Sequence, residues 1–333
     1  MKRFIPYVIS LVLVCCNSCE CGSSTEPPPP PPPGGARQEM RDFVAQISAY
    51  AKGINANFVI IPQNGQDIVT DNSDPSETPN PAYLNAIDGI GREDLFYGYE
   101  DDNTATDPDV TNEIVAFLNI YENNGVQALV TDYVSTTSRM DDSYQRNATL
   151  NFASFAADHR ELDNIPNHPA RPNRENSNNI NTLSDVQNFL YILNPDNTSN
   201  FANKTDYLTK LRNTNYDLFI IDAYHAGDLL SAADVQSLKT KANGGRRLVV
   251  SYMSIGEAEN YRYYWLSSWN SNRPSWVREE NPNFEGNFIV EYWDAGWQAI
   301  IYGNNNSYLK KILDAGFDGV YLDIIDAFEY FEN

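Results

Sequence analysis

Cysteine is missing from the chain after residue 21. All four cysteines lie before that point, and they are Cys15, Cys16, Cys19 and Cys21. Neither a disulfide framework nor a cysteine metal site therefore supports the folded part. The chain has three histidines, which are His159, His168 and His225. They are widely separated and form no HExxH motif, so the sequence gives little support to metal catalysis, and we predict no metal and no cofactor.

Other motifs are also absent. The chain has no GxSxG, which argues against a Ser/His/Asp hydrolase, and no glycine fingerprint for phosphate. Basic residues are few, with 23 Lys and Arg against 45 Asp and Glu and a formal net charge of -22. This acidity argues against nucleic acid as a partner, because phosphates would be repelled. It permits a cationic substrate, although it equally serves to keep an exported protein soluble.

The first 35 residues are typical of an exported, tethered protein. Lys2 and Arg3 precede an apolar run that is too short to span a bilayer, so residues 1–16 predict a signal peptide. Leu13 to Cys16 resembles a bacterial lipobox with Cys16 lipidated; plain secretion is the alternative. Residues 17–35 contain an unbroken proline run and predict a stiff spacer. We therefore expect an extracytoplasmic protein, a cell-surface or periplasmic lipoprotein or otherwise secreted, that meets membrane only through a lipid anchor.

The remaining roughly 300 residues suffice for one large domain and alternate between helical and strand patterns. Helices are predicted at 38–53, 109–124, 141–157, 206–213, 232–242 and 307–315. Strands are predicted at 58–62, 89–98, 128–134, 188–193, 217–222, 247–254, 287–292 and 319–323. Eight strands are what a closed (β/α)8 TIM barrel needs, so we predict this α/β fold for residues 36–333. An open doubly wound sheet is the alternative.

Five apolar stretches run directly into a carboxylate or an amide. These are FVIIPQN ending at Asn64, ALVTD at Asp132, LFIID at Asp222, VVSYMSIGE at Glu257 and GVYLD at Asp323. Buried parallel strands that end in polar groups at one rim are how a TIM barrel builds an active site. The pattern therefore indicates an enzyme.

Three long segments resemble glycoside hydrolase family 114, the endo-α-1,4-polygalactosaminidase-like proteins. They are SYMSIGEAENYRYYW at 251–265, EYWDAGWQ at 291–298 and GFDGVYLDIIDAFE at 316–329. Shorter segments that also look like this family are FVIIPQNG at 58–65, AIDGIGREDLFYG at 86–98 and VTDYV at 130–134. The resemblance implies a TIM-barrel glycosidase (an O-glycosyl hydrolase) that needs no cofactor.

The order of these segments departs from the family. The segment resembling residues 36–162 follows the GVYLDIID strand in such proteins, whereas here it precedes the rest. We therefore predict a circular permutation in which 36–162 and 182–333 are joined by the Asn- and Pro-rich linker 163–181. In the unpermuted order FLYIL would be strand one, followed by LFIID, VVSYM, FIVEY, GVYLD, FVIIP, the Glu93 segment and ALVTD.

Glycoside hydrolysis needs two carboxyl groups flanking the scissile bond. Asp323 ends an apolar strand, and the resemblance implies that it is the catalytic nucleophile; the alternatives are an N-cap or a structural ion pair. The resemblance also selects Glu93 as the general acid/base. Glu257 is the rival for that role, because a glycine precedes it and an apolar strand leads to it.

Further residues are predicted to bind substrate. They are Gln63, Asn64, Asp132, Tyr133, Asp222, Tyr252, Arg262, Trp293, Asp294 and Asp326. For Asp132 and Asp222 a capping role is the alternative, and Asp326 is equally a helper or a helix N-cap. All five tryptophans fall between 265 and 297, where they form sugar subsites or pack the core.

Together these observations predict a monomeric glycosidase acting on an α-1,4-linked galactosamine-type polysaccharide. The resemblance implies retention of configuration, and a cationic amino sugar polymer would suit the acidic chain. A non-catalytic carbohydrate-binding surface lipoprotein on the same scaffold is the alternative from a different functional class.

Overall fold

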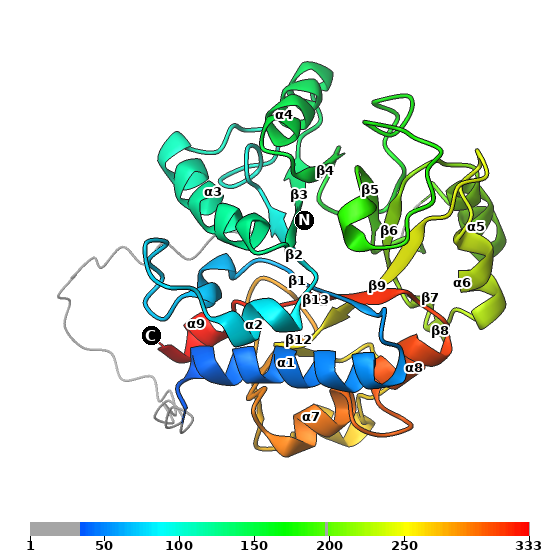
Figure 1. Cartoon of the computed structure of the whole chain (residues 1–333). Helices are drawn as coiled ribbons and strands as arrows, with labels where there is room; N and C mark the ends of the chain where they lie inside the picture. The colour runs from blue at the N-terminus through cyan, green and yellow to red at the C-terminus, as the bar shows by residue number, and fades with distance from the viewer. Residues whose placement is uncertain (1–33, 197–198, 333) are drawn as a thin grey trace, which may run out of the picture.

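The computed structural model describes residues 34–196 and 199–332 (Figure 1). The predicted signal peptide at 1–16, the lipidation site Cys16 and nearly all of the spacer at 17–35 lie outside the described residues. Among the residues described, no helix combines the length and the apolar character needed to cross a membrane.

Parallel strands form the centre of the molecule, and in the described residues there are eight in two sheets. One sheet has the order β1-β13-β9-β6-β5 and the other the order β2-β3-β4. Their bounds are β1 Val59–Pro62, β2 Gly89–Glu93, β3 Gln127–Tyr133, β4 Ala153–Ala157, β5 Phe189–Ile192, β6 Leu218–Asp222, β9 Leu248–Ser254 and β13 Gly319–Asp323. Nearly all their residues are buried, as expected of strands covered on both faces.

The two sheets meet at both of their edges. Gln63, directly after β1, forms a parallel bridge with Gly91 of β2, and Ser154 of β4 forms one with Asn188, directly before β5. The amide of Asn64 also donates to the carbonyl of Gly91 at 2.8 Å. The predicted α/β architecture with parallel sheets is thus confirmed. Closure into a (β/α)8 barrel stays a prediction, which the two bridges support.

Helices surround the strands (Figure 1). Their bounds are α1 Ala36–Ile54, α2 Pro81–Ala86, α3 Pro108–Asn123, α4 Thr137–Thr149, α5 Lys204–Arg212, α6 Ala232–Leu238, α7 Ala295–Ile301, α8 Tyr308–Asp314 and α9 Ala327–Glu332. Short 3-10 turns lie at η1 Gln66–Val69, η2 Leu183–Asp185 and η3 Ser267–Asn270. Helix α1 buries the apolar stripe that the sequence predicted and packs against α2, α8 and α9. Its Arg37 pairs with Glu332 of α9 at 3.3 Å.

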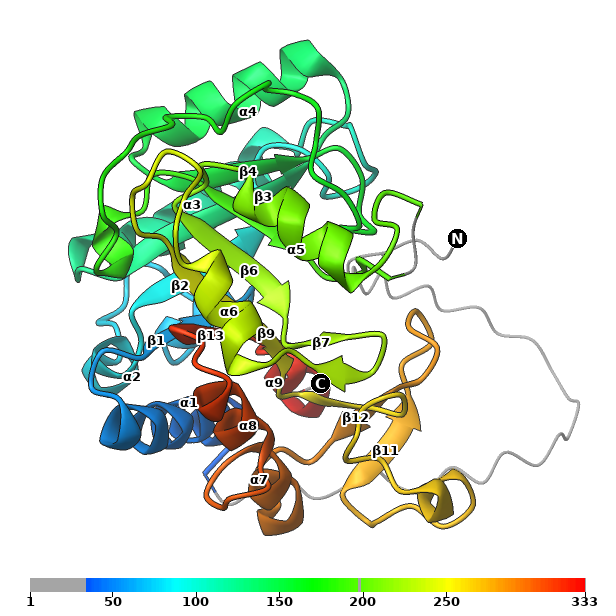
Figure 2. The same cartoon turned by 90° about the vertical axis from the view of Figure 1, so that its right-hand side faces the viewer.

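The structure corrects the prediction that 287–292 is a strand of the parallel barrel. Residues Asn287–Val290 form β12, which pairs antiparallel with β10 (Glu257–Glu259) and β11 (Val277–Glu280), outside the parallel sheets (Figure 2). Only Val290 of β12 is buried. A short apolar run does not reveal whether its neighbours will be parallel or antiparallel, so the sequence pattern could not separate this insertion from a barrel strand. A two-residue hairpin pair, β7 (Tyr224–His225) and β8 (Asp228–Leu229), lies after β6.

The structure also corrects the prediction of one helix over 141–157. Helix α4 ends at Thr149, Asn151 turns the chain with φ 63°, and β4 follows as a parallel neighbour of β3. The segment Ala153–Ala157 is rich in alanine, which favours helices, but its pairing with Leu129–Tyr133 overrides that preference. The proposed unpermuted order changes accordingly. GVYLD lies directly beside VVSYM as strand four, and ASFAA becomes strand eight.

Aromatic side chains fill the space between the strands. The rings of Tyr191 on β5 and Tyr321 on β13 meet edge to face at 5.3 Å. A Cβ atom at Gly91 would lie 2.1 Å from the Tyr321 hydroxyl, so only glycine leaves room for this ring beside β2.

A buried ion pair fastens the 163–181 linker. Lys241 Nζ contacts Asp217 Oδ1 at 2.8 Å, and both side chains are fully buried. Lys241 also donates to the carbonyl of Asn176, and Asn176 donates to Asp217. We expect Lys241→Met to lower the free energy of unfolding by about 3–5 kcal/mol, because it leaves a buried carboxylate unpaired.

The matched control is Lys210→Met, which breaks the exposed Lys210–Asp206 pair at 2.8 Å. That pair should contribute about 0–1 kcal/mol. Urea unfolding of both variants measures the difference, and equal losses would contradict the role given to Lys241.

Candidate active site

The carboxyl ends of the parallel strands carry the polar residues that the sequence singled out. Glu93 ends β2, Asp222 ends β6 and Asp323 ends β13, while Asn64 lies two residues after β1. Because the strands are parallel, these residues lie at one rim. Only β1 separates β2, which ends in Glu93, from β13, which ends in Asp323, and only β9 separates β13 from β6, which ends in Asp222.

Asn64 lies between the two carboxyl groups in strand order and contacts one of them. Its Nδ2 donates to Glu93 Oε2 at 3.0 Å, and its Oδ1 accepts from the Glu93 amide at 3.1 Å. Asn64 has a left-handed φ of 57°, which asparagine tolerates better than most residues and which turns the chain at the end of the strand. The Tyr133 hydroxyl donates to the other oxygen, Glu93 Oε1. Both oxygens of Glu93 are thus oriented by the protein.

Asp323 is held in a similar way. The Tyr252 hydroxyl donates to Oδ2 at 2.7 Å, and the amide of Ile324 donates to Oδ1 at 2.8 Å. Ile324 has a φ of 60°, which is strained for a β-branched residue. A Cβ atom at Gly256 would lie 2.2 Å from the Ile324 carbonyl, so glycine is needed where this turn approaches β9. Such local strain is typical of functional sites.

The carboxyl groups at this rim influence one another. Burial raises the pKa of Asp323 well above its ordinary value, the negative charge of Glu93 raises it further, and the two hydrogen bonds oppose the shift. Burial also raises the pKa of Asp326 to about 6, with Arg92 opposing and Glu93 contributing. Asp323, Glu93 and Asp326 nevertheless keep part of their surface exposed. Asp323 and Asp326 are therefore accessible and retain their protons to a higher pH than isolated carboxyls would.

Glu257, the rival for the acid/base role, lies in the antiparallel insertion. It is buried on β10 and accepts from Asn281 Nδ2 at 2.6 Å and Asn287 Nδ2 at 3.1 Å. Burial raises its pKa, with the charges of Asp326 and Glu259 contributing. Its contacts with Asn281 and Asn287 tie the antiparallel insertion together.

Asp222 and Arg262 bind each other. Arg262 Nη1 contacts Asp222 Oδ2 at 2.7 Å, and its Nε contacts Glu259 Oε2 at 2.6 Å. Burial raises the pKa of Asp222, and Arg262 opposes the shift. Asp222 also accepts from the amide of Tyr224 at 2.8 Å. The pair joins the rim of the parallel sheet to the antiparallel insertion, and both side chains are largely withdrawn from solvent.

Asp132 is fully buried at the end of β3. It accepts from the amides of Phe96 and Tyr97 at 2.9 and 3.3 Å and from the Ser143 hydroxyl at 2.6 Å. Burial raises its pKa, and these hydrogen bonds oppose the shift. Asp132 thus fixes the loop that follows Glu93 by accepting from two of its backbone amides.

Three other predicted residues contact the protein rather than the carboxyl pair. Gln63 is buried and accepts from the Tyr191 hydroxyl at 3.2 Å. Trp293 packs against Phe331 at 4.6 Å between ring centroids, and Asp294 caps α7 by accepting from Gly296. The remaining tryptophans pack mostly on one another, with ring centroids at 5.3 Å for both the Trp265–Trp269 and Trp269–Trp276 pairs. Core packing accounts for most of this aromatic cluster.

Several residues of the site were not singled out from the sequence. Arg92 adds positive charge beside Glu93 and donates to Gln66 Oε1 at 3.1 Å. Arg160 pairs with Asp94 at 2.8 Å. The position of Arg92 next to Glu93 was a usable signal, but nothing in the sequence connects Arg160 with a residue 66 positions away.

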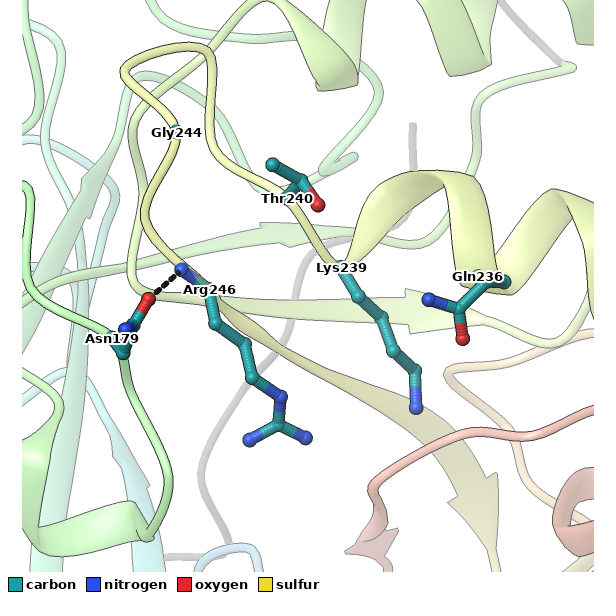
Figure 3. A pocket seen from close by; sticks show the side chains of 6 residues that line it. All are labelled: Asn179, Gln236, Lys239, Thr240, Gly244 and Arg246. Carbon is teal, nitrogen blue, oxygen red and sulfur yellow. Dashed lines mark hydrogen bonds between the residues drawn. The ribbon is translucent and has the colours of Figure 1, made fainter.

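A separate pocket of about 350 Å³ lies away from this rim (Figure 3). Its lining includes Lys239 and Arg246, which both pair with Asp318, the residue directly before β13. It therefore lies near the opposite end of the strands from Asp323, and its two cations share the single carboxylate of Asp318. In residues 34–196 and 199–332, no group of three or more histidine, cysteine or acidic side chains is placed to hold a metal ion.

Parts of the chain are similar to known proteins. Residues 170–333 match the profile of Glycoside-hydrolase family GH114, a (β/α)8-barrel family. An uncharacterized protein of Methanocaldococcus jannaschii is 40% identical over 123 residues, which is 37% of this chain and 34% of the relative. Uncharacterized proteins of Thermotoga maritima and Deinococcus radiodurans are each 37% identical, over 36% and 38% of this chain and the same shares of theirs. The chain thus spans about a third of these relatives.

We expect Asp323→Asn to stabilise the free protein at alkaline pH. A carboxyl whose folded pKa lies above its unfolded value costs stability progressively as the pH rises above about 3.9, the unfolded value. The variant should therefore unfold at a higher temperature than the wild type at pH 8, and the difference should vanish near pH 4. Thermal unfolding followed by circular dichroism across this range measures the effect.

The control is Asp206→Asn, since hydrogen bonds and charge from Lys210 lower the pKa of Asp206. Its removal should leave the unfolding temperature equal or slightly lower at pH 8. An Asp323→Asn protein that is less stable than the wild type at pH 8 would contradict the strained, desolvated state assigned to Asp323.

Proposed function

We propose that the protein is a glycoside hydrolase that uses Asp323 and Glu93 as its pair of carboxyl groups. One observation carries the proposal: two partly exposed carboxyls lie at the same rim on strands flanking β1, and the charge of one raises the pKa of the other. Two carboxyls that share a site are the minimum requirement for cleaving a glycosidic bond. The match of residues 170–333 to family GH114 supports the same activity.

In the proposed mechanism Asp323 is the nucleophile and Glu93 the general acid/base. Glu93 donates a proton to the leaving oxygen while Asp323 attacks the anomeric carbon, and Glu93 then activates water that hydrolyses the glycosyl ester. The raised pKa of Asp323 bears on the first step, because a nucleophilic carboxylate must be ionised. Its proton has to leave as substrate enters, and the hydrogen bond from Tyr252 favours the ionised form.

We propose retention of configuration. Retaining enzymes place the two carboxyls about 5–5.5 Å apart, and inverting enzymes about 6.5–9.5 Å apart to admit a water molecule. The residues that resemble the polygalactosaminidase-like proteins include GVYLD, which ends at Asp323. That resemblance is the basis for proposing retention.

We propose an α-1,4-linked galactosamine-type polysaccharide as substrate. The net charge of -22 supports a polymer that carries positive charge wherever its amino groups are free. Asp326 at the same rim adds a third carboxyl that could face an amino or hydroxyl group. Tyr261 is 61% exposed near the rim and offers a ring to the apolar face of a sugar.

We also propose the circular permutation, the export and the monomeric state expected from the sequence. The profile of family GH114 covers the second half of the chain, while the segment that resembles the later part of such proteins comes first. Helices α1 and α9 pack against each other on the outside of the strands, where a permuted chain could be opened without disturbing the rim (Figure 1). We likewise propose that Cys16 carries a lipid anchor.

The proposal is tested by incubating residues 34–333 with a panel of amino sugar and neutral polysaccharides. We expect product from the wild type, and losses in kcat of about 100-fold or more for Asp323→Asn and Glu93→Gln, because both groups take part in the transition state. Glu257→Gln should lose less than tenfold. Proton NMR identifies the anomer that is released first, which distinguishes retention from inversion.

Equal activity in the wild type and Asp323→Asn would remove Asp323 from the mechanism. A greater loss for Glu257→Gln than for Glu93→Gln would transfer the acid/base role to Glu257. Binding of a polysaccharide without cleavage would favour the alternative, a non-catalytic carbohydrate-binding protein on this scaffold.

A further inference from the structure

Two buried tyrosines flank the carboxyl pair. The strand order β3-β2-β1-β13-β9 brings Tyr133, Glu93, Asn64, Asp323 and Tyr252 to one rim in that order. Tyr133 lies on β3, next to the strand that bears Glu93, and Tyr252 lies on β9, next to the strand that bears Asp323. The arrangement is therefore nearly symmetric about Asn64. Tyr133 is 2% exposed and Tyr252 is 7% exposed. Both hydroxyl groups donate a hydrogen bond to a carboxyl group, Tyr133 to Glu93 and Tyr252 to Asp323.

An arginine lies over each tyrosine ring. Cζ of Arg160 is 3.9 Å from the centroid of Tyr133, and Cζ of Arg262 is 6.0 Å from the centroid of Tyr252. Both distances fall within the range of a cation–π contact, and the closer one is the stronger. The positive charge over the ring also makes the hydroxyl a better donor to a carboxylate. Arg160 therefore helps to hold the Tyr133 ring and strengthens its hydrogen bond. Arg262 lies at the limit of this range from Tyr252 and is closer to the rings of Tyr261 and Tyr308, at 5.4 and 5.7 Å.

Each arginine is in turn fixed by two acidic residues. Arg160 contacts Asp94 at 2.8 Å and Asp102 at 2.7 Å, and it also donates to the carbonyl of Gly98 at 2.8 Å. Arg262 contacts Asp222 at 2.7 Å and Glu259 at 2.6 Å, and its side chain is 8% exposed. The same sequence of contacts, from acidic pair to arginine to tyrosine to carboxyl, thus occurs on both sides of β1.

We propose that Tyr133 and Tyr252 are the positioning residues of the active site, each of which fixes one carboxyl group in the orientation needed for glycosidic cleavage. This inference rests on the proposed function. It assigns the two tyrosines a role different from the substrate contacts expected from the sequence. Burial keeps the pKa of both phenols well above the ordinary value, so they act as permanent hydrogen-bond donors rather than as acids or bases.

Thermodynamic double-mutant cycles test the proposal without any substrate. Tyr133→Phe is combined with Glu93→Gln, and Tyr252→Phe with Asp323→Asn. We expect each matched pair to deviate from additivity by roughly 2 °C or more in the unfolding midpoint. The reason is that either substitution alone already disrupts the hydrogen bond that joins the two side chains. The crossed pair, Tyr133→Phe with Asp323→Asn, should be additive.

Kinetics supply the second readout. Each Tyr→Phe variant should lose roughly 10- to 100-fold in kcat with little change in KM, as expected when a hydrogen bond to a charged group is lost in the transition state. The control is Tyr144→Phe, which removes a buried hydroxyl that accepts from the amide of Ala156 at 3.1 Å. It should change kcat less than threefold.

The outcomes separate the two proposals. Coupling in the matched pairs, together with no cleavage of any polysaccharide by the wild type, would support the tyrosine–carboxyl contacts and reject the glycosidase. Additive matched pairs would overturn the positioning role. A rise in KM without a fall in kcat would also overturn it, because the tyrosines would then be binding substrate directly.

Discussion

Two carboxyl groups held on the strands on either side of β1 are the constraint around which the rest of the rim is built. Glu93 and Asp323 are far apart in the sequence, yet parallel pairing brings the ends of β2 and β13 to either side of β1. Burial and mutual repulsion both disfavour ionisation, and the pKa of Asp323 is raised as a result. Hydrogen bonds from Tyr252 and from the amide of Ile324 offset part of that cost. Arg160 and Arg262 lie behind the tyrosines, and each is held by two acidic residues.

Much of the fold could be read from the sequence, because buried parallel strands have a distinctive composition. Apolar runs such as Leu218–Asp222 and Gly319–Asp323 are too short for helices and lead directly into acidic residues. The two errors have a common cause. Asn287–Val290 and Ala153–Ala157 are short segments whose state is decided by the strand beside them, which is β10 in one case and β3 in the other. Local pattern carries no information about that neighbour.

The candidate site was predictable to a similar extent. Asp323 follows from the strand pattern, whereas Glu93 was chosen only through resemblance, because its segment also reads as a loop. In the structure Glu93 is the last residue of a strand, where it pairs with Thr131 of β3 and accepts a hydrogen bond from Asn64. Asp132 and Asp222 look equivalent to Asp323 in sequence but have buried internal partners, Ser143 and Arg262. The partners come from distant segments, so tertiary contacts decide which strand-end acid remains available.

The seam between the two sheets runs between the two carboxyls. Glu93 belongs to the three-stranded sheet and Asp323 to the five-stranded one, and β1 meets β2 through the single bridge from Gln63 to Gly91. Besides that bridge, the seam is held by the amide of Asp88, which donates to the carbonyl of Ile60 at 2.9 Å, and by the contacts of Asn64 with Gly91 and Glu93. The gap across which the glycosidic oxygen would be attacked is therefore spanned by a seam with fewer ladder pairs than the sheets on either side of it. A change in the width of that seam would change the separation of the two acids, on which the choice between retention and inversion depends.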